Sequence, residues 1–272
     1  MADSRAIGVF DSGLGGLTVA RELIRELPQE DIVYFGDTGR VPYGSRSPET
    51  ILQYARQDIA FLLSQDVKCI MAACGTVSST YPDAAKDLPV PYFEMVTHAA
   101  RAAVAATKSG KIGVIGTAAT VGSGSHKREI LKLMPKAEVT ACSCSLFVPL
   151  VEVGWYSADD VVVKETVKRY LAPIIDAGCD TLILGCTHYP VLQSVIGEVV
   201  GSNVTLINPG IAVAEAVRDY LASADSESES KAAGNHEFFV TDKPYSFKSL
   251  AAVLLGEKIN EDKVKQVELD SL

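Results

Sequence analysis

Two pairs of similar segments recur along this 272-residue chain. Ala6–Gly15 (AIGVFDSGLG) resembles Lys111–Thr120 (KIGVIGTAAT), an offset of 105 residues. Ile70–Thr76 (IMAACGT) resembles Leu182–His188 (LILGCTH), an offset of 112 residues. Because the two offsets differ so little, the pattern predicts two similar halves with a small insertion between them.

Short apolar runs alternate with segments whose apolar residues recur at helical spacing. Strands are predicted at 6–10, 31–35, 69–73, 111–116 and 181–184, and helices at 17–27, 50–64, 99–107 and 159–177. This alternation is typical of α/β proteins, in which helices cover parallel sheets. Ligands bind at the carboxyl ends of parallel strands. Two such halves facing each other across a cleft would therefore each deliver a strand-end cysteine, Cys74 or Cys186, to one pocket.

Composition excludes several classes of protein. The formal net charge of −9 argues against a general nucleic-acid binder, which needs clustered cations. No apolar run approaches the ~20 residues that span a bilayer, and the first residues lack an export signal. We therefore expect a cytoplasmic protein with reduced thiols. The polar stretch 223–235 is predicted to be a solvated surface loop.

The six cysteines do not suggest a disulfide framework in a chain of this length. Zinc is poorly supported because no CxxC pair exists and the four histidines are scattered. The close pair Cys142 and Cys144 is interpreted as core packing rather than as a metal or redox motif, and Cys69 and Cys179 as structural.

Cys74 and Cys186 each follow a predicted strand and precede a predicted helix. A helix N-terminus favours an anion, so we expect the pKa of both thiols to be lowered. A lone cysteine is more often a small buried hydrophobe, but two cysteines at equivalent positions of a repeat favour a paired role.

Two thiols on opposite sides of a planar intermediate suit one reaction. One thiolate removes a proton from a stereocentre, and the opposite thiol returns a proton to the other face. The carbanion needs stabilisation by hydrogen bonds or by a cofactor, and no specific pyridoxal-phosphate signature is present. An alternative is nucleophilic catalysis by Cys186 with His188 as base, which leaves Cys74 unexplained.

Six motifs, in order along nearly the whole chain, resemble those of the glutamate racemase family. They are GVFDSGLGGLTV, VYFGDTGRVPYG, ACGT, IGVIGTAAT, LFVPLVEVGW and LILGCTHYPVL. The resemblance implies two α/β domains related by pseudo-twofold symmetry, 1–97 plus 209–272 and 98–208, with the active site in the cleft between them. It also implies a cytoplasmic homodimer that needs no cofactor or metal, interconverts L- and D-glutamate, and supplies D-glutamate for peptidoglycan.

The resemblance assigns catalytic roles position by position. Cys74 and Cys186 match the two catalytic thiols, and Asp11 matches a residue that contacts the substrate ammonium and assists proton transfer. His188 matches a residue that tunes Cys186, and Glu152 an acidic residue of the site. Residues matched to substrate binding are Asp11, Ser12, Pro42, Tyr43, Gly44, Gly75, Thr76, Thr117, Thr187 and His188. Local alternatives are that Asp11 caps a turn, that 42–44 is only a turn, and that His188 is a satisfied core histidine.

The chain departs from the family pattern at two positions. Gly75 stands where the pattern has asparagine, and His126 where it has an aromatic residue. A lost polar contact at position 75 costs roughly 1–3 kcal/mol unless water replaces it. Asparagine at 75 is expected to improve turnover, provided that the backbone there has room for a side chain. Two alternatives stay open: a racemase for another acidic amino acid such as aspartate, and an amino-acid-binding homologue weakened by Gly75.

Overall fold

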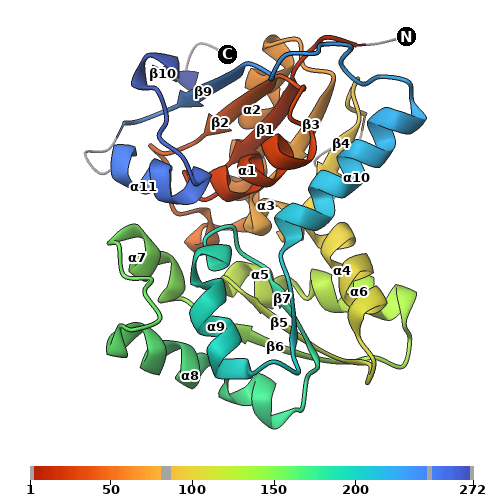
Figure 1. Cartoon of the computed structure of the whole chain (residues 1–272), viewed down its shortest axis with the longest axis vertical. Helices are drawn as coiled ribbons and strands as arrows, with labels where there is room; N and C mark the ends of the chain where they lie inside the picture. Colours follow the sequence, from red (N-terminus) through yellow and green to blue (C-terminus); the bar gives the residue numbers. More distant parts are fainter. Residues whose placement is uncertain (1–2, 81–86, 244–246, 270–272) are drawn as a thin grey trace.

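Two parallel sheets organise the chain, whose computed structural model describes residues 3–80, 87–243 and 247–269. The first sheet has the strand order β10-β9-β2-β1-β3-β4, and the second has the order β6-β5-β7-β8. Every pairing within them is parallel. Figure 1 shows the two sheets in separate halves of the molecule, one above the other.

The first sheet contains β1 (Ile7–Asp11), β2 (Ile32–Gly36), β3 (Cys69–Ala72), β4 (Tyr92–Glu94), β9 (His236–Val240) and β10 (Val264–Gln266). The second contains β5 (Lys111–Gly116), β6 (Glu138–Ser143), β7 (Thr181–Leu184) and β8 (Thr205–Ile207). The helices are α1 (Leu17–Glu26), α2 (Pro48–Ser64), α3 (Gly75–Thr80), α4 (Met95–Ala106), α5 (Ala118–Ser123), α6 (Ser125–Leu133), α7 (Phe147–Glu152), α8 (Val161–Asp176), α9 (Gln193–Val200), α10 (Pro209–Ser223) and α11 (Phe247–Leu255). Short 3₁₀ helices include η1 (Tyr43–Ser45) and η3 (Tyr189–Leu192).

The predicted repeat and the α/β class are confirmed. The order β2-β1-β3-β4 in the first sheet matches β6-β5-β7-β8 in the second, strand for strand. The strands at 111–116 and 181–184 have the predicted ends, and the other predicted strands and helices differ by a few residues. The edge strands β4, β6, β8 and β10 were not predicted, because they are short or less apolar, and neither was β9, which lies between β10 and β2.

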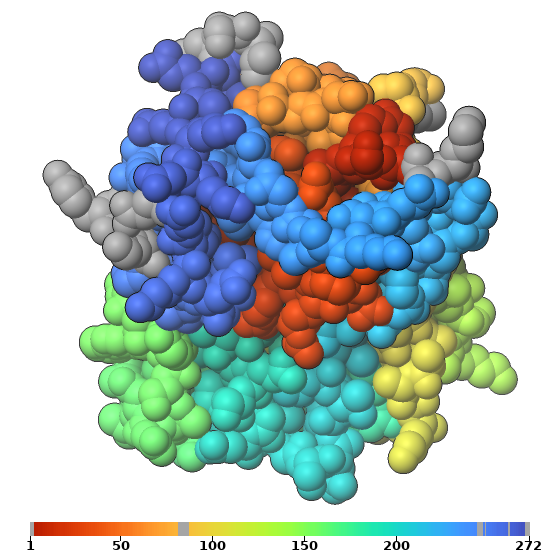
Figure 2. All heavy atoms as spheres, turned by 45° about the horizontal axis from the view of Figure 1, so that its top comes forward, coloured from red at the N-terminus to blue at the C-terminus, as the bar shows by residue number. Residues whose placement is uncertain are grey.

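The helix after the last strand of each repeat crosses to the other domain. α4 follows β4 but buries Ala99 and Ala103 against Ile112 and Ile183 of the second sheet. α10 follows β8 but packs against α1 on the first sheet. Figure 2 shows the same division, with N-terminal red and C-terminal blue residues together in one half. The predicted boundaries at 97/98 and 208/209 lie at these crossings and stay a prediction.

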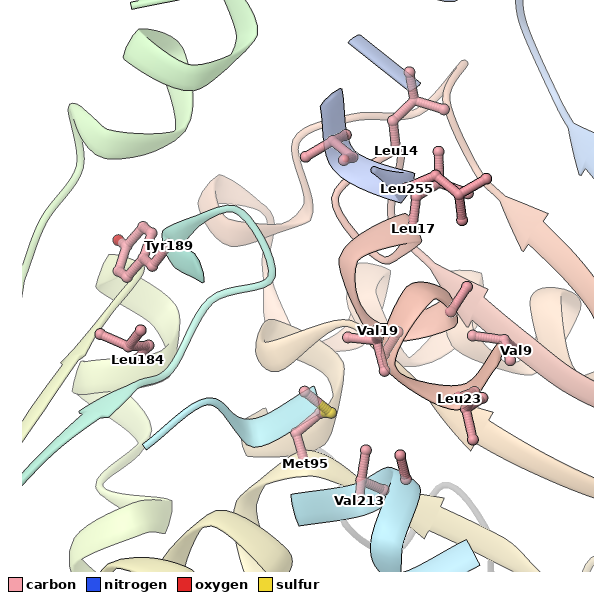
Figure 3. Close-up of a cluster of buried hydrophobic side chains, with 14 of the residues drawn as sticks. Val9, Leu14, Leu17, Val19, Leu23, Met95, Leu184, Tyr189, Val213 and Leu255 are labelled. Carbon is pink, nitrogen blue, oxygen red and sulfur yellow. The ribbon is translucent and has the colours of Figure 1, made fainter. Parts of the chain in front are cut away.

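One apolar cluster continues from the first sheet to the second. It includes Val9 and Leu23 from the first domain and Leu184 and Tyr189 from the second, with Met95 between them (Figure 3). Each Å² of apolar surface kept from water contributes roughly 25 cal/mol. The shared cluster therefore stabilises a close arrangement of the two domains. Among the described residues, no helix is both long and apolar enough to cross a membrane.

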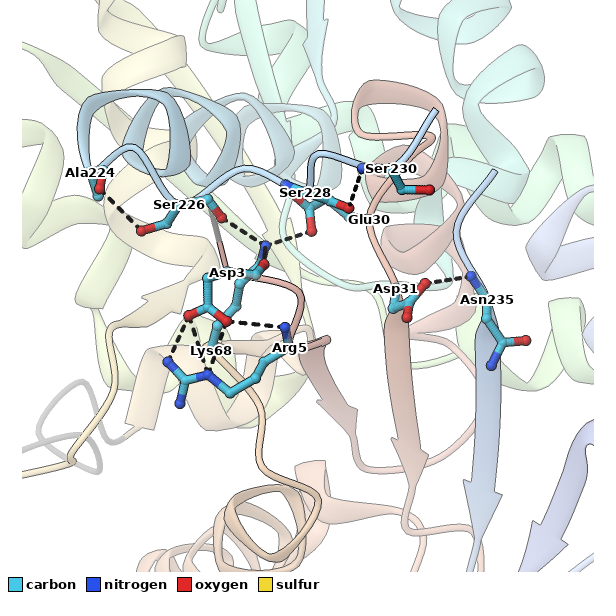
Figure 4. A network of polar contacts seen from close by, with 10 residues as sticks. All are labelled: Asp3, Arg5, Glu30, Asp31, Lys68, Ala224, Ser226, Ser228, Ser230 and Asn235. Carbon is cyan, nitrogen blue, oxygen red and sulfur yellow. Dashed lines mark hydrogen bonds and ion pairs between the residues drawn. The ribbon is translucent and has the colours of Figure 1, made fainter. Parts of the chain in front are cut away.

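A buried ion pair anchors the polar stretch 223–235 at the amino ends of β2 and β3. Lys68 Nζ lies 2.6 Å from Glu30 Oε2, and both side chains are almost fully buried. The ammonium also donates to the carbonyl oxygens of Asp3 and Ser226, while the Ser228 amide donates to Glu30 (Figure 4). The stretch is largely exposed, as predicted, but one end of it is held by these contacts.

Replacing Lys68 with methionine leaves the Glu30 carboxylate buried without its partner. We expect Lys68→Met to lower the free energy of unfolding by about 3–5 kcal/mol. Lys168→Met is the matched control, because its pair with Glu165 is solvent-exposed and contributes at most about 1 kcal/mol. Urea denaturation of both variants measures the difference. Equal, small losses would show that the buried pair does not stabilise the fold.

Candidate active site

A cavity of about 360 Å³ lies where the two domains meet. Asp11 ends β1 and Cys74 follows β3, while Thr117 follows β5 and Cys186 follows β7. The four residues thus mark the carboxyl ends of equivalent strands in the two sheets. The cavity wall includes every residue predicted from the sequence: Asp11, Ser12, Pro42, Tyr43, Gly44, Cys74, Gly75, Thr76, Thr117, Glu152, Cys186, Thr187 and His188.

The Cys74 thiol is buried beside two polar groups of the segment that follows β1. Its Sγ lies 3.4 Å from the Ser12 Oγ. Burial and the nearby Asp11 carboxylate raise the pKa of Cys74 to about 12, although hydrogen bonds from Ser12 and Val77 oppose the shift. The prediction that a helix N-terminus lowers this pKa is wrong, because desolvation of the thiolate outweighs the effect of α3. Cys74 is therefore a thiol in the unliganded protein.

Cys186 has a cationic neighbour instead. Burial disfavours the charged form of His188, but interactions with Cys186 and Glu152 outweigh it and raise the pKa of His188 to about 10. His188 Nε2 lies 3.3 Å from Glu152 Oε1. At neutral pH the imidazole is therefore protonated beside Cys186. The interactions with Cys186 and Glu152 mean that His188 is more than a satisfied core histidine.

Asp11 both shapes a turn and faces the cavity. Its Oδ2 accepts a hydrogen bond from the Gly13 amide at 3.0 Å, so the alternative of a turn-capping aspartate is also correct. Burial raises the pKa of Asp11, while the charge of His188 and the backbone amides of Gly16, Gly13 and Ser12 lower it. An acidic group that is buried and held by backbone donors is suited to binding a cationic part of a ligand.

The Pro-Tyr-Gly turn, residues 42–44, is fixed from behind by a buried polar network. The Tyr43 hydroxyl donates to Asp37 and, at 3.0 Å, to Asp58 Oδ2. Arg40 pairs with the same two carboxylates at 2.6 and 3.1 Å. The Tyr43 hydroxyl is thus engaged with carboxylates, and the backbone of residues 43–44 is what the turn can offer a ligand.

The two domains touch around the cavity through hydroxyls. Thr76 Oγ1 lies 3.2 Å from Thr117 Oγ1, one residue from each domain. Thr18 Oγ1 donates to the Thr187 carbonyl oxygen at 2.8 Å. At Gly15 a Cβ atom would lie 2.3 Å from Thr187 Oγ1, so only glycine allows this approach. Thr76, Thr117 and Thr187 are therefore held in place by interdomain contacts.

Gly75 also lies at a close approach between two backbone segments. A Cβ atom there would lie 2.6 Å from the carbonyl oxygen of Gly185, in the loop that carries Cys186. The atom that would have to move belongs to the backbone, so the condition attached to the asparagine prediction is not met. A side chain at 75 would push apart the two segments that carry Cys74 and Cys186.

Sequence reasoning missed several residues of the wall. Cys144, Ser145, Val148 and Pro149 line the cavity alongside Glu152. Val148 and Pro149 precede Glu152 on α7 by four and three residues, which is the helical spacing that puts them on one face. The core interpretation of Cys144 is correct, since it is fully buried, and its position beside the cavity had no signal in the local sequence. Cys69 and Cys179 are also buried.

Among the described residues, no group of three or more His, Cys, Asp or Glu side chains has the arrangement of a metal site. The independence of the protein from metal and cofactors stays a prediction.

Known proteins of similar sequence identify the family of this chain. The profile of the family described as Asp/Glu/Hydantoin racemase matches residues 7–217. The chain belongs to this family. It is 43% identical over 268 residues to the glutamate racemase of Geobacter metallireducens, with 98% of each chain covered. It is 42% identical over 254 residues to that of Syntrophus aciditrophicus, with 93% of each covered. The chain is thus an amino-acid racemase, an isomerase, and its resemblance to glutamate racemase is confirmed.

Solved structures agree with the fold. Glutamate racemase from Francisella tularensis in complex with D-glutamate has a TM-score of 0.91 and 36% identity, with 99% of this chain and 100% of that one covered. The Thermus thermophilus enzyme in complex with β-chloro-D-alanine has a TM-score of 0.88 and 41% identity over the full length of both chains. An aspartate racemase from Picrophilus torridus, 17% identical with a TM-score of 0.58, shares the fold alone.

The Glu152 carboxylate should control the charge on His188. We expect Glu152→Gln to lower the pKa of His188 below its value of about 10, because the amide no longer stabilises the imidazolium. NMR titration can follow the His188 ring separately, because the pKa values of the other three histidines, His98, His126 and His236, are all lowered.

Glu165→Gln, at an exposed position of α8, is the control and should leave the titration unchanged. The stabilisation that Cys186 and Glu152 together give to protonated His188 is present below about pH 6.5 and is lost as the pH rises through about 10. An unchanged midpoint in Glu152→Gln would contradict this assignment.

Proposed function

We propose that the protein interconverts L- and D-glutamate without a cofactor, by proton transfer between the substrate α-carbon and two cysteines. One observation carries the proposal: Cys74 and Cys186 follow equivalent strands of the two domains and line the same cavity. The curated relatives at about 40% identity are glutamate racemases, which supports glutamate as the substrate.

The proposed step conserves protons. The thiolate of one cysteine takes the α-proton and becomes a thiol, while the thiol of the other donates its proton to the opposite face of the carbanion and becomes a thiolate. The product is the mirror image of the substrate, and the two cysteines have exchanged protonation states. The protein must then move one proton between the two sides before the next turnover in the same direction.

The neighbours of each thiol supply different assistance. On one side, burial and Asp11 favour the protonated form of Cys74. On the other, the imidazolium of His188 can donate a hydrogen bond to a thiolate of Cys186 and can exchange a proton with it. Cys74, as a protonated thiol, is therefore suited to be the acid in the direction in which Cys186 is the base. Asp11 also binds the substrate ammonium, and Glu152 keeps His188 charged.

The remaining polar wall is suited to the two carboxylates of the substrate. Donors are available from Ser12, Thr76, Thr117 and Thr187, and from the backbone of residues 43–44 in the turn fixed by Tyr43. Hydrogen bonds to the α-carboxylate stabilise the negative charge that develops during proton removal. Pro42 and Gly44 shape the turn, and the glycine at 75 keeps the two thiol-bearing segments close.

We also propose that the enzyme is a cytoplasmic homodimer that supplies D-glutamate for peptidoglycan, and that it has no nucleic-acid or membrane partner. Aspartate is the alternative substrate, because the length of the pocket for the substrate side chain selects between aspartate and glutamate. A Cys186–His188 nucleophile fits the local contact, but it gives no role to Cys74 at the equivalent position. A binding protein without turnover is the third alternative.

Replacing each thiol separately tests the two-cysteine mechanism. We expect Cys74→Ser and Cys186→Ser both to lose racemisation of glutamate, because a serine hydroxyl is hardly ionised at neutral pH. Circular dichroism with each enantiomer, without added cofactor, measures this. A glutamate analogue with a β leaving group needs only the base for elimination. Each variant should therefore still eliminate from one enantiomer of the analogue and no longer from the other. The enantiomer that is retained should differ between the two variants.

Cys142→Ser is the control, because Cys142 does not belong to the cavity wall and its replacement should leave both activities intact. The mechanism is contradicted if both variants keep the same enantiomer, or if either racemises at the wild-type rate. Faster turnover of aspartate than of glutamate by the wild-type protein would instead reassign the substrate.

A further inference from the structure

A second, smaller cavity lies directly behind the wall of the first. It has a volume of about 10 Å³ and is lined by Ala73, Gly75, Met95, His126, Gly185, Cys186, Thr187 and Pro209. Gly75, Cys186 and Thr187 line both cavities. The small cavity is therefore separated from the proposed substrate site by a single layer of chain, and that layer carries one of the two thiols.

Of the described residues that line this cavity, His126 is the one with an ionisable side chain besides Cys186. It is the second residue of α6 and is 4% exposed. Neither Nδ1 nor Nε2 has a hydrogen-bond partner among the described residues. Its ring edge faces Gly185, where a Cβ atom would lie 3.5 Å from Cε1 and 3.7 Å from Nε2 of the imidazole. The ring thus points at the loop that carries Cys186.

An imidazole in this position has unused hydrogen-bonding capacity. Burial lowers the pKa of His126 to about 4, so at neutral pH the ring is neutral and has one donor and one acceptor. Leaving a buried donor or acceptor unpaired costs about 1–3 kcal/mol. A cavity of roughly 10–15 Å³ holds one water molecule if polar partners surround it. The small cavity lies at the lower end of this range; Gly75 and Gly185 line it with backbone atoms, and the His126 nitrogens are the unpaired polar atoms beside it.

We propose that the small cavity binds a single water molecule through the His126 imidazole, and that His126 positions the Cys186 loop through this water. The water bridges the ring to the backbone of the loop at the close approach of Gly75 and Gly185. His126 is therefore a positioning residue, and it does not touch the substrate. The role rests on the proposed racemase function, since Cys186 is the group whose position matters.

The two departures from the family pattern meet at this cavity. Gly75 has no side chain that could donate a hydrogen bond, and His126 stands where the pattern has an aromatic residue. Gly75 allows the close approach to the Gly185 loop, and the imidazole of His126 brings polar atoms to the cavity beside that loop.

The test compares His126→Phe with His126→Gln in the full-length enzyme. Phenylalanine fills the ring's place but holds no water, so we expect kcat for glutamate to fall about tenfold while KM changes less than about twofold. Thermal stability should change little, because phenylalanine keeps the packing of the ring and removes the buried nitrogens together with the water that they bind. Glutamine restores a donor and an acceptor and should recover most of kcat. His98→Phe on α4 is the control, since His98 does not line this cavity.

A high-resolution crystal structure of the wild-type enzyme provides the second measurement. It should show one ordered water within hydrogen-bond distance of a His126 nitrogen, and this water should be absent in His126→Phe. A dry cavity overturns the proposal, as does wild-type kcat in His126→Phe or a failure of glutamine to recover it. If the wild-type protein does not racemise glutamate, the proposed function fails. The electron density of the crystal structure would still show whether the small cavity holds a water molecule.

Discussion

The close approach of Gly75 to Gly185 is the constraint on which the arrangement of the site depends. Each glycine immediately precedes or follows a strand-end cysteine, so the contact sets how near the two thiol-bearing segments can come. A Cβ atom at 75 would lie 2.6 Å from a backbone oxygen, and Gly15 makes a similar approach to Thr187 on the same interface. The shared apolar cluster keeps the two domains together at this contact. So do α4 and α10, each of which packs against the other domain.

Symmetry of the fold does not extend to the electrostatics of the site. The strands that precede the two cysteines are equivalent, yet Cys74 has Asp11 as its charged neighbour and Cys186 has His188. The proposed reaction needs one thiol and one thiolate at its start, which a fully symmetric site would not favour. Asp11 at the end of β1 and His188 after Cys186 thus give two equivalent thiols different charged neighbours.

Much of this could be predicted from the sequence, because repeated segments and periodic apolar residues are local signals. The two sheets and the meeting of thirteen site residues around one cavity follow from them and from the family motifs. The raised pKa of Cys74 could not be predicted, since desolvation depends on how Asp11 and the neighbouring strands cover the thiol. The clash at Gly75 and the position of Cys144 arise from contacts between segments about 40 to 110 residues apart, which no local pattern encodes.

The isotopic content of the first product formed in D₂O tests the central claim most directly. Wild-type enzyme is given protiated L-glutamate, and both enantiomers are analysed at low conversion. A thiol carries a single proton, so the base cysteine can return only the protium that it took, whereas the opposite cysteine donates deuterium from solvent. The account predicts D-glutamate with deuterium at the α-carbon and residual L-glutamate that stays protiated. D-glutamate that retains protium would show that one group serves both faces, and would contradict it.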